Sequence, residues 1–216
     1  MTVLITGANR GIGRALFDRY AKLGPVIGTR RTGEDAELWA TLDVRAPESH
    51  GALGKRLNGA PIPLLICNAG VYLDRGQGLA SGYGIELWAQ TFATNVTGVF
   101  LTVQALLPNL RAAQGAKIAI ISSQMASHTR APGGSYIYRA SKAAALNLGR
   151  NLASDLKPEG IAVGIYHPGW VKTDMGGDAA DITVDEAAEG LIARFDALSF
   201  ATTGCFETWD RRSHPY

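Results

Sequence analysis

Short apolar runs alternate along the chain with longer stretches in which apolar residues recur every three or four positions. The short runs predict strands at Val3–Ile5, Val26–Thr29, Leu42–Val44, Leu64–Ile66, Ile118–Ile121, Ile161–Tyr166 and Cys205–Trp209. The longer stretches predict helices at Ile12–Leu23, Ser49–Leu57, Leu87–Arg111, Tyr136–Leu156 and Val184–Leu198. Arg31–Thr41 is too short for a helix with its turns, so we expect a loop or a single helical turn there.

Continuous apolar strands separated by helices are typical of a parallel sheet covered on both faces. Right-handed crossovers then give a doubly wound sheet, whose ligands bind beyond the carboxyl ends of the strands. The chain shows no internal repeat and no interdomain linker. We therefore expect residues 1–216 to form one α/β domain around a seven-stranded parallel sheet. Thr183 and Glu186 form a predicted capping box at the start of the last helix.

Composition narrows the class of protein. The 216 residues are 46% hydrophobic and 19% charged and include 26 glycines, which is typical of a globular domain. No apolar run reaches the roughly 18–20 residues of a membrane span, and Arg10 and Arg14 interrupt any signal-peptide pattern. Two cysteines cannot form a disulfide framework, and a net charge of +2 does not favour nucleic-acid binding. We expect a cytoplasmic protein without membrane, nucleic-acid or metal partners.

A glycine-rich loop follows the first predicted strand. Gly7, Gly11 and Gly13 have the spacing Gly-x₃-Gly-x-Gly and lead directly into a helix. Glycines permit a tight turn and close approach of a ligand, and the start of a helix offers free N–H groups to a phosphate. The loop therefore indicates a dinucleotide site, the alternative being a glycine-rich loop without a ligand.

Polar residues with catalytic potential lie near the same edge of the predicted sheet. Tyr138 and Lys142 are four residues apart on a predicted helix and so share one face. Ser122 and Ser123 end the strand Ile118–Ile121, and Asn68-Ala69-Gly70 ends the strand before it. Asn95 lies inside a predicted helix, where an amide is a poor helix former and needs another reason to occur.

Together these motifs resemble the short-chain dehydrogenases/reductases. The ordered elements are Thr6-Gly7-x₃-Gly11-x-Gly13, Asp43, Asn68-Ala69-Gly70, Asn95, Ser123, Tyr138-x₃-Lys142 and Pro168-Gly169. The resemblance spans Thr6 to Trp209, and the segments 138–142 and 167–177 look most like the C-factor-like branch. It implies a Rossmann fold that binds NAD(P) and transfers a hydride between a nicotinamide and a carbonyl or carbinol carbon.

The resemblance also implies four catalytic roles. Tyr138 would give or take the proton, and Lys142 would stabilise its phenolate and hold the nicotinamide ribose. Ser123 would hydrogen-bond the substrate oxygen, and Asn95 would position a water that connects Lys142 to solvent.

One spacing departs from the family. The catalytic serine usually precedes the tyrosine by thirteen residues, whereas Ser123 precedes Tyr138 by fifteen. We interpret residues 131–136 as carrying a two-residue insertion, as in the C-factor-like branch. Ser122 is the second choice for the catalytic serine, and Ser135 is expected to cap the following helix.

The cofactor contacts implied by the resemblance fall in five segments. They are the glycine loop (Thr6, Gly7, Asn9, Arg10, Gly11, Ile12, Gly13), the adenine side (Asp43, Val44), the adenosine side (Asn68, Ala69, Gly70), the carboxamide side (Pro168, Gly169, Val171, Thr173) and the end of the second strand (Arg30, Arg31). That strand end carries no carboxylate. Its arginines and Arg10 favour NADP(H) over NAD, unless they are ordinary solvated arginines.

The sequence thus indicates an NADP(H)-dependent oxidoreductase that interconverts a carbonyl compound and an alcohol. The alternatives are a dinucleotide-binding sensor or signalling protein, and an epimerase or dehydratase, which would carry a longer C-terminal substrate region. The family also forms dimers through two long helices, so a homodimer or homotetramer is expected. Gly176–Ile182 is a short substrate loop, which suggests an open pocket and a broad or bulky substrate.

Overall fold

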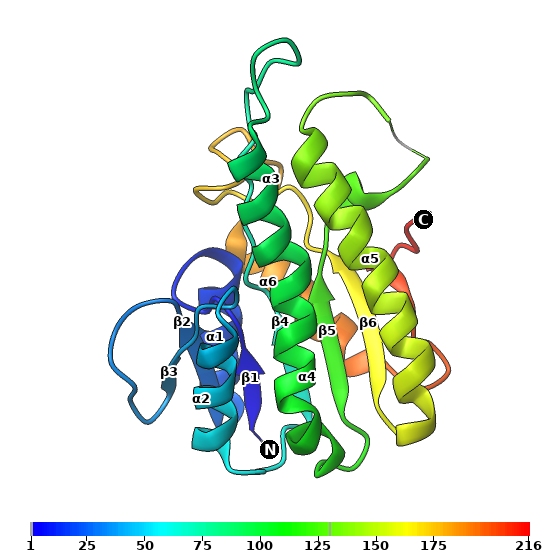
Figure 1. Cartoon of the computed structure of the whole chain (residues 1–216). Coiled ribbons are helices and arrows are strands. Elements are labelled where there is room, and N and C mark those ends of the chain that lie inside the picture. The colour runs from blue at the N-terminus through cyan, green and yellow to red at the C-terminus, as the bar shows by residue number, and fades with distance from the viewer. Residues whose placement is uncertain (1, 130) are drawn as a thin grey trace.

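Seven parallel strands form one sheet in the computed structural model, which describes residues 2–129 and 131–216 (Figure 1). The sheet order is β3-β2-β1-β4-β5-β6-β7. The strands are β1 (Val3–Ile5), β2 (Val26–Arg30), β3 (Trp39–Thr41), β4 (Leu64–Cys67), β5 (Lys117–Ile121), β6 (Ala162–His167) and β7 (Phe206–Thr208). The chain reverses its direction of winding between β3 and β4, which creates a crevice at the carboxyl ends of β1 and β4. The predicted doubly wound α/β fold is confirmed.

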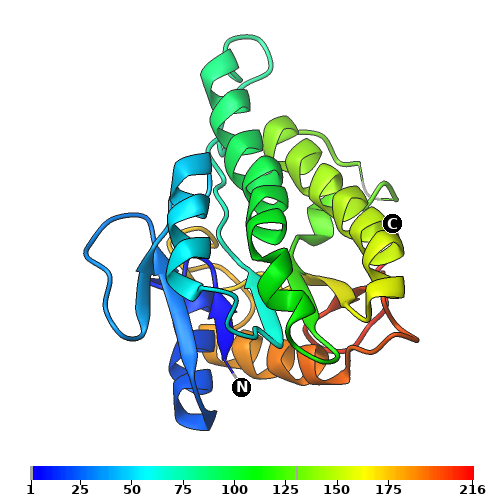
Figure 2. The ribbon, with the colours of Figure 1, turned by 60° about the horizontal axis from the view of Figure 1, so that its bottom comes forward.

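Side chains of the strands alternate between two apolar layers. In β1, Leu4 packs into one layer, whereas Val3 and Ile5 pack into the other. Helices α2 (Pro47–Leu57), α4 (Gly98–Arg111) and α5 (Tyr136–Leu156) cover the first layer, and α1 (Gly11–Leu23) and α6 (Val184–Ala197) cover the second. Figures 1 and 2 show these two groups on opposite sides of the sheet. Burial on both faces explains why the strands are continuously apolar.

The third strand lies three residues before its predicted position. Leu42–Val44 was expected to form it, but Trp39–Thr41 pairs with β2, and Leu42 and Val44 are instead buried in the core. The segment between β2 and β3 contains no helical turn. Arg30 stabilises this loop by donating to the Glu34 carbonyl (2.8 Å) and by lying over the Trp39 ring. The apolar pattern was misleading because Leu42 and Val44 are buried just beyond the paired residues, with the Leu42 N–H donating to the Arg30 carbonyl at the end of β2 (2.8 Å).

The long helix predicted at Leu87–Arg111 is interrupted. Helix α3 (Ile85–Phe92) passes through a π-helical turn (Ala93–Thr97) into α4. The turn contains Asn95, whose amide hydrogen-bonds the backbone of Val71. Single π turns within helices occur frequently at functional sites, and here the turn directs an amide into the protein interior.

The beginnings of two helices were also predicted, with different outcomes. The capping box of Thr183 and Glu186 at α6 is confirmed. Ser135 does precede α5, but it has a left-handed backbone (φ 47°) and makes no side-chain cap bond, so the cap prediction was wrong. Within residues 2–129 and 131–216, no helix is long and apolar enough to cross a membrane.

Candidate active site

The glycine loop brings the ends of β1 and β4 and the start of α1 together. Gly7 has φ 63°, and a Cβ there would lie 3.0 Å from Ala69 Cα. A Cβ on Gly13 would lie 2.3 Å from the Gly7 carbonyl oxygen, so only glycine permits this approach. No side chain caps α1, which leaves its first N–H groups available to an anion.

Thr6 and Asn68 connect the two strand ends by hydrogen bonds. The Thr6 hydroxyl accepts from the backbone N–H groups of Asn68 and Ala69, both at 3.0 Å. The Asn68 amide donates to the carbonyls of Thr6 (3.0 Å) and Gly7 (3.1 Å). These residues therefore set the shape of the crevice between β1 and β4.

Tyr138 and Lys142 share one buried face of α5, as predicted. The Lys142 ammonium donates to the Ile121 carbonyl at 2.9 Å and lies 5.7 Å from the centre of the Tyr138 ring. Burial lowers the pKa of Lys142 to about 8. Burial raises the pKa of Tyr138 to about 12, and a hydrogen bond with Ser123 opposes this rise.

The structure separates the two neighbouring serines. Ser123 contacts the Tyr138 hydroxyl, and its own hydroxyl accepts from the Met125 N–H at 3.1 Å. Ser122 donates instead to the Lys142 carbonyl at 3.1 Å and is buried. Ser123 therefore lies beside the tyrosine despite the unusual spacing, whereas Ser122 joins β5 to α5.

Asn95 lies beside Lys142 but is held by protein groups. Its amide donates to the carbonyl of Val71 (2.9 Å) and to the hydroxyl of Ser141 (3.0 Å), and it accepts from the Val71 N–H (2.8 Å). Gly70 lies between the two side chains, because a Cβ there would be 3.4 Å from Asn95 Oδ1 and 3.5 Å from Lys142 Nζ. Asn95 thus fixes the β4–α3 segment against α5.

Sequence reasoning missed the segment that follows Asn68-Ala69-Gly70. The ring of Tyr72 stacks on that of Tyr138, with centroids 4.3 Å apart, and its hydroxyl contacts that of Ser135. The Asp74 carboxylate is fully buried and accepts from the N–H groups of Ile137 (2.9 Å) and Tyr138 (3.3 Å). Asp74 therefore supplies the cap of α5 that Ser135 was expected to provide. The sequence offered one signal for this segment, because it follows a central strand at the edge of the sheet where ligands bind.

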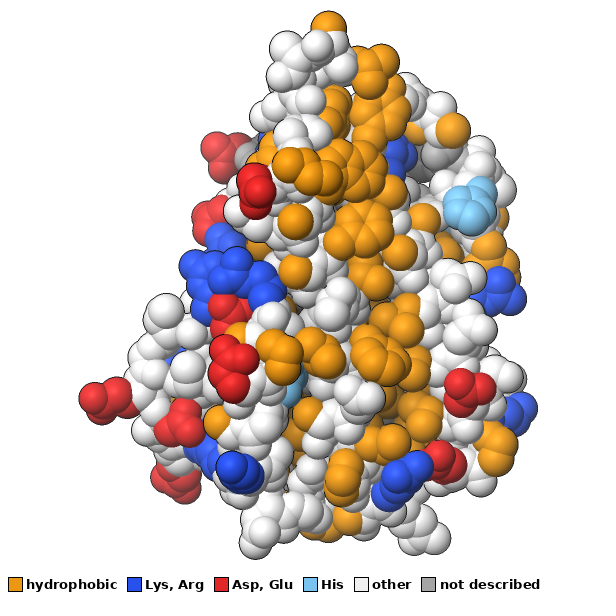
Figure 3. Space-filling view, in the orientation of Figure 1, with side chains coloured by type: hydrophobic (Ala, Val, Ile, Leu, Met, Phe, Trp, Pro, Cys, Tyr) orange, Lys and Arg blue, Asp and Glu red, His pale blue; other side chains and the backbone are white. Residues whose placement is uncertain are grey.

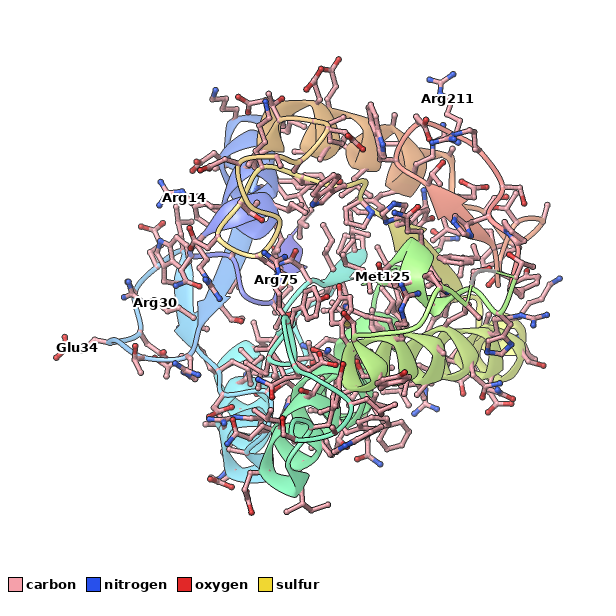
Figure 4. All side chains as sticks on the ribbon, turned by 90° about the horizontal axis from the view of Figure 1, so that it is seen from above. Arg14, Arg30, Glu34, Arg75, Met125 and Arg211 are labelled. Carbon is pink, nitrogen blue, oxygen red and sulfur yellow. The ribbon has the colours of Figure 1, made fainter. Side chains whose placement is uncertain are left out.

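A cavity of about 490 Å³ opens at the carboxyl edge of the sheet. Figure 4 looks onto this edge, with Arg75 and Met125 near the centre. The cavity brings together predicted residues of four segments, namely Ile12, Ser123, Tyr138, Pro168, Gly169, Val171 and Thr173. Trp170, Met175 and His167 also line it. A larger hollow along α1 is lined by charged side chains and contains no predicted catalytic residue.

The residues expected at the adenosine end are partly engaged with other groups. The Asp43 carboxylate accepts two hydrogen bonds from the Arg45 guanidinium and one from the Arg45 N–H, and these contacts lower its pKa to about 2. Arg30 is committed to the β2–β3 loop, whereas Arg31 is exposed beside Asp43. Arg10 forms an exposed ion pair with Asp174 (3.2 Å). Arg31 and Arg10 thus remain accessible to a phosphate.

The remaining adenine-side residue, Val44, is buried against Gly98 of α4. Asn9 is exposed at the mouth of the glycine loop. The uncapped α1 terminus, the close backbone approach at Gly7 and Gly13, and a buried ammonium with further donors fit a nicotinamide dinucleotide. Among the described residues, no group of three or more His, Cys, Asp or Glu side chains could hold a metal ion.

Comparisons with known proteins agree with this geometry. The family described as short chain dehydrogenase matches residues 1–182. The 1-hydroxy-2-glutathionyl-2-methyl-3-butene dehydrogenase of Rhodococcus sp. is 34% identical over 97% of this chain and 96% of its own. The C-signal protein of Myxococcus xanthus is 35% identical over 72% of this chain and 93% of its own. The NADPH-bound carbonyl reductase from chicken fatty liver has a TM-score of 0.88 and 31% identity, covering 100% of this chain and 98% of that one. The chain therefore belongs to the short-chain dehydrogenase/reductase family of oxidoreductases and resembles its C-signal-like members.

Proposed function

We propose that this protein is an NADP(H)-dependent oxidoreductase that interconverts a carbonyl compound and an alcohol, with Tyr138 as the proton donor or acceptor. The observation that carries the proposal is that Ser123 and Tyr138 meet at one cavity, next to the glycine loop, with the buried Lys142 ammonium behind the Tyr138 ring. Each side chain is chemically competent for its role. A carbonyl reductase among the solved relatives is consistent with this reaction class.

The nicotinamide would supply or accept the hydride. In the reductive direction, the Tyr138 hydroxyl gives its proton to the substrate oxygen, while the Ser123 hydroxyl donates a hydrogen bond to the same oxygen. The buried phenol has a pKa of about 12, which is poorly matched to neutral pH. The Lys142 ammonium favours the phenolate by its opposite charge, and with a pKa near 8 it remains largely charged at neutral pH. Asn95 keeps the Lys142 face of the site in place.

The contacts proposed for the cofactor follow the segments around the crevice. The glycine loop would hold the diphosphate, Asp43 and Val44 the adenine, and residues 68–70 the adenosine ribose. Residues 168–173 would hold the carboxamide. Arg31 and Arg10 would bind the 2′-phosphate, and the NADPH-bound relative supports this preference.

Two variants test the reaction and the cofactor separately. Tyr138→Phe is expected to abolish NADPH oxidation with aldehydes, ketones and quinones while NADPH affinity changes by less than a few-fold. Retained turnover would contradict the proton-transfer role. Arg31→Ala is expected to weaken NADPH by about tenfold or more and to leave NADH unchanged. Equal effects on the two cofactors would contradict the phosphate contact.

A second candidate is a dinucleotide-binding sensor or signalling protein, which the similarity to C-signal favours. The two candidates differ in turnover. If NADPH binds tightly and none of the carbonyl compounds is reduced, the sensor becomes the better description. The complete set of catalytic side chains supports the enzyme.

The proposed assembly is a homodimer or homotetramer of single domains spanning residues 1–216, in the cytoplasm. Figure 3 shows apolar side chains along the face formed by α3, α4 and α5, where Ile85, Phe100 and Tyr136 are exposed. A second copy would cover this face. Light scattering after size exclusion tests it, and Phe100→Glu is expected to yield monomers. An unchanged mass for that variant, or a monomeric wild type, would contradict this interface.

A further inference from the structure

The wall of the active-site cavity is positively charged. Arg75 and Arg139 line it, and no Asp or Glu occurs among its described lining residues. A concave site whose charges have one sign attracts ligands of the opposite sign. The charge of this cavity is not required by the hydride transfer itself, because both the carbonyl compound and the alcohol can be neutral.

Arg75 has no carboxylate partner within the described part of the protein. It takes part in none of the ion pairs found between described residues. Its neighbour in sequence, Asp74, points away into the core and accepts N–H groups of α5. The guanidinium contacts only uncharged groups there, the Met175 carbonyl and the Tyr72 ring at 5.0 Å. Because a guanidinium has five N–H donors, several remain for a ligand.

The position of Arg75 ties this charge to the reacting atoms. Its guanidinium lies over the Tyr72 ring, and that ring stacks on Tyr138. The charge of Arg75 also acts on the phenol directly and lowers its pKa, against the larger effect of burial. On its other side, Arg75 reaches the loop after β6 through Met175. It therefore stands at the rim of the cavity, between the catalytic tyrosine and the substrate loop.

We propose that the substrate carries a carboxylate near its reacting carbon and that Arg75 binds this carboxylate. The substrate is then an oxo acid in the reductive direction and a hydroxy acid in the oxidative direction. A hydride from the reduced nicotinamide, which would be oxidised, joins the carbonyl carbon, a proton from Tyr138 joins the oxygen, and the carboxylate is unchanged. A planar guanidinium can bind a carboxylate through two parallel hydrogen bonds, and this match favours a carboxylate as the anionic group of the substrate. This inference rests on the proposed reductase activity.

Matched pairs of compounds test the proposal. Each pair consists of an oxo acid and its primary amide, which has a similar shape but no charge. Across the pairs, the carboxyl group lies two, three or four carbons along the chain from the reacting carbonyl, or on an aromatic ring. NADPH oxidation gives kcat/KM for each compound. We expect at least one acid to exceed its amide by about tenfold or more, as a charged hydrogen-bonded contact would produce.

Variants of Arg75 test whether this residue causes the preference for the acid over the amide. Arg75→Gln is expected to bring the acid-to-amide ratio close to one, and Arg75→Lys, which keeps the charge, to restore it in part. Arg111→Gln is the control, because Arg111 pairs with Glu159 at the opposite edge of the sheet. Ratios at or below one for every wild-type pair, or a ratio that survives in Arg75→Gln, would overturn the proposal while leaving the reductase activity intact. Absence of turnover for acids and amides alike would instead overturn the proposed function, and this inference with it.

Discussion

Replacing Lys142 with Met should stabilise the folded protein in the absence of cofactor. Lys142 is only 6% exposed, and burial lowers its pKa from an ordinary 10.5 to about 8. At about 1.4 kcal/mol per pKa unit, this difference corresponds to about 3 kcal/mol of destabilisation by the buried ammonium. The variant leaves the Ile121 carbonyl without its donor, which costs about 1 kcal/mol. The expected net gain in the free energy of unfolding is about 2 kcal/mol at neutral pH.

The pH dependence of this gain follows from the direction of the pKa change. Below about pH 8, Lys142 is charged in both the folded and the unfolded protein, and the buried charge destabilises the folded state by its full amount. Between about pH 8 and the ordinary pKa of 10.5, the folded state loses its proton first and this destabilisation declines. The advantage of the Lys142→Met variant over the wild type should therefore be largest near neutral pH and disappear by about pH 10.5.

Urea unfolding of the cofactor-free protein at several pH values measures the effect. Lys55→Met is the matched control, because Lys55 is exposed on α2 and its replacement should change stability by less than about 0.5 kcal/mol. A Lys142→Met variant that is less stable than the wild type at neutral pH, by an amount independent of pH, would refute the reasoning. The same variant should lose turnover, since the ammonium that favours the phenolate is gone.

Three further substitutions probe the architecture of the site. Asp74→Ala should lower the free energy of unfolding by about 1–3 kcal/mol, because two N–H groups of α5 lose their acceptor. Asp74→Asn should lose less stability, and equal thermal unfolding of the wild type and both variants would contradict the capping role. Gly13→Ala should abolish NADPH binding in fluorescence titrations, since its Cβ would meet the Gly7 carbonyl, whereas Gly51→Ala, in open space on α2, should stabilise the fold by about 0.5–1 kcal/mol. Ser123→Ala should reduce kcat by about 10²-fold or more, and a comparable loss of kcat in Ser122→Ala would contradict the separation of the two serines.

Local sequence predicted most of the fold because its signals are short in range. The apolar runs of β1, β4, β5 and β6 reflect burial on both faces, and a run of this kind is visible within five or six residues. The third strand was misplaced because Leu42 and Val44 are buried just beyond the residues that pair with β2, and an apolar pattern reports burial only. The π turn around Asn95 depends on hydrogen bonds to Val71, which no local pattern reveals.

The candidate site divides in the same way. The glycine loop, Tyr138 and Lys142 were predicted because their spacing is set within one loop or one helix. The sequence already placed Ser123 ahead of Ser122. Only the packing of β5 against α5 shows how their surroundings differ, because Ser122 donates to the Lys142 carbonyl whereas Ser123 contacts Tyr138.

By itself, the sequence determined the doubly wound sheet, the glycine loop and the placement of Tyr138 and Lys142 on one helix face, because each is encoded in periodicity or in fixed spacing along one element. Only the tertiary structure decided that Asp74 caps α5 and that Tyr72 stacks on Tyr138. It alone placed Arg75 at the cavity rim, without a carboxylate partner among the described residues. Asp74 and Tyr72 are more than sixty positions from the residues of the helix that they contact, and only the meeting of β4 and α5 at one edge of the sheet brings them together.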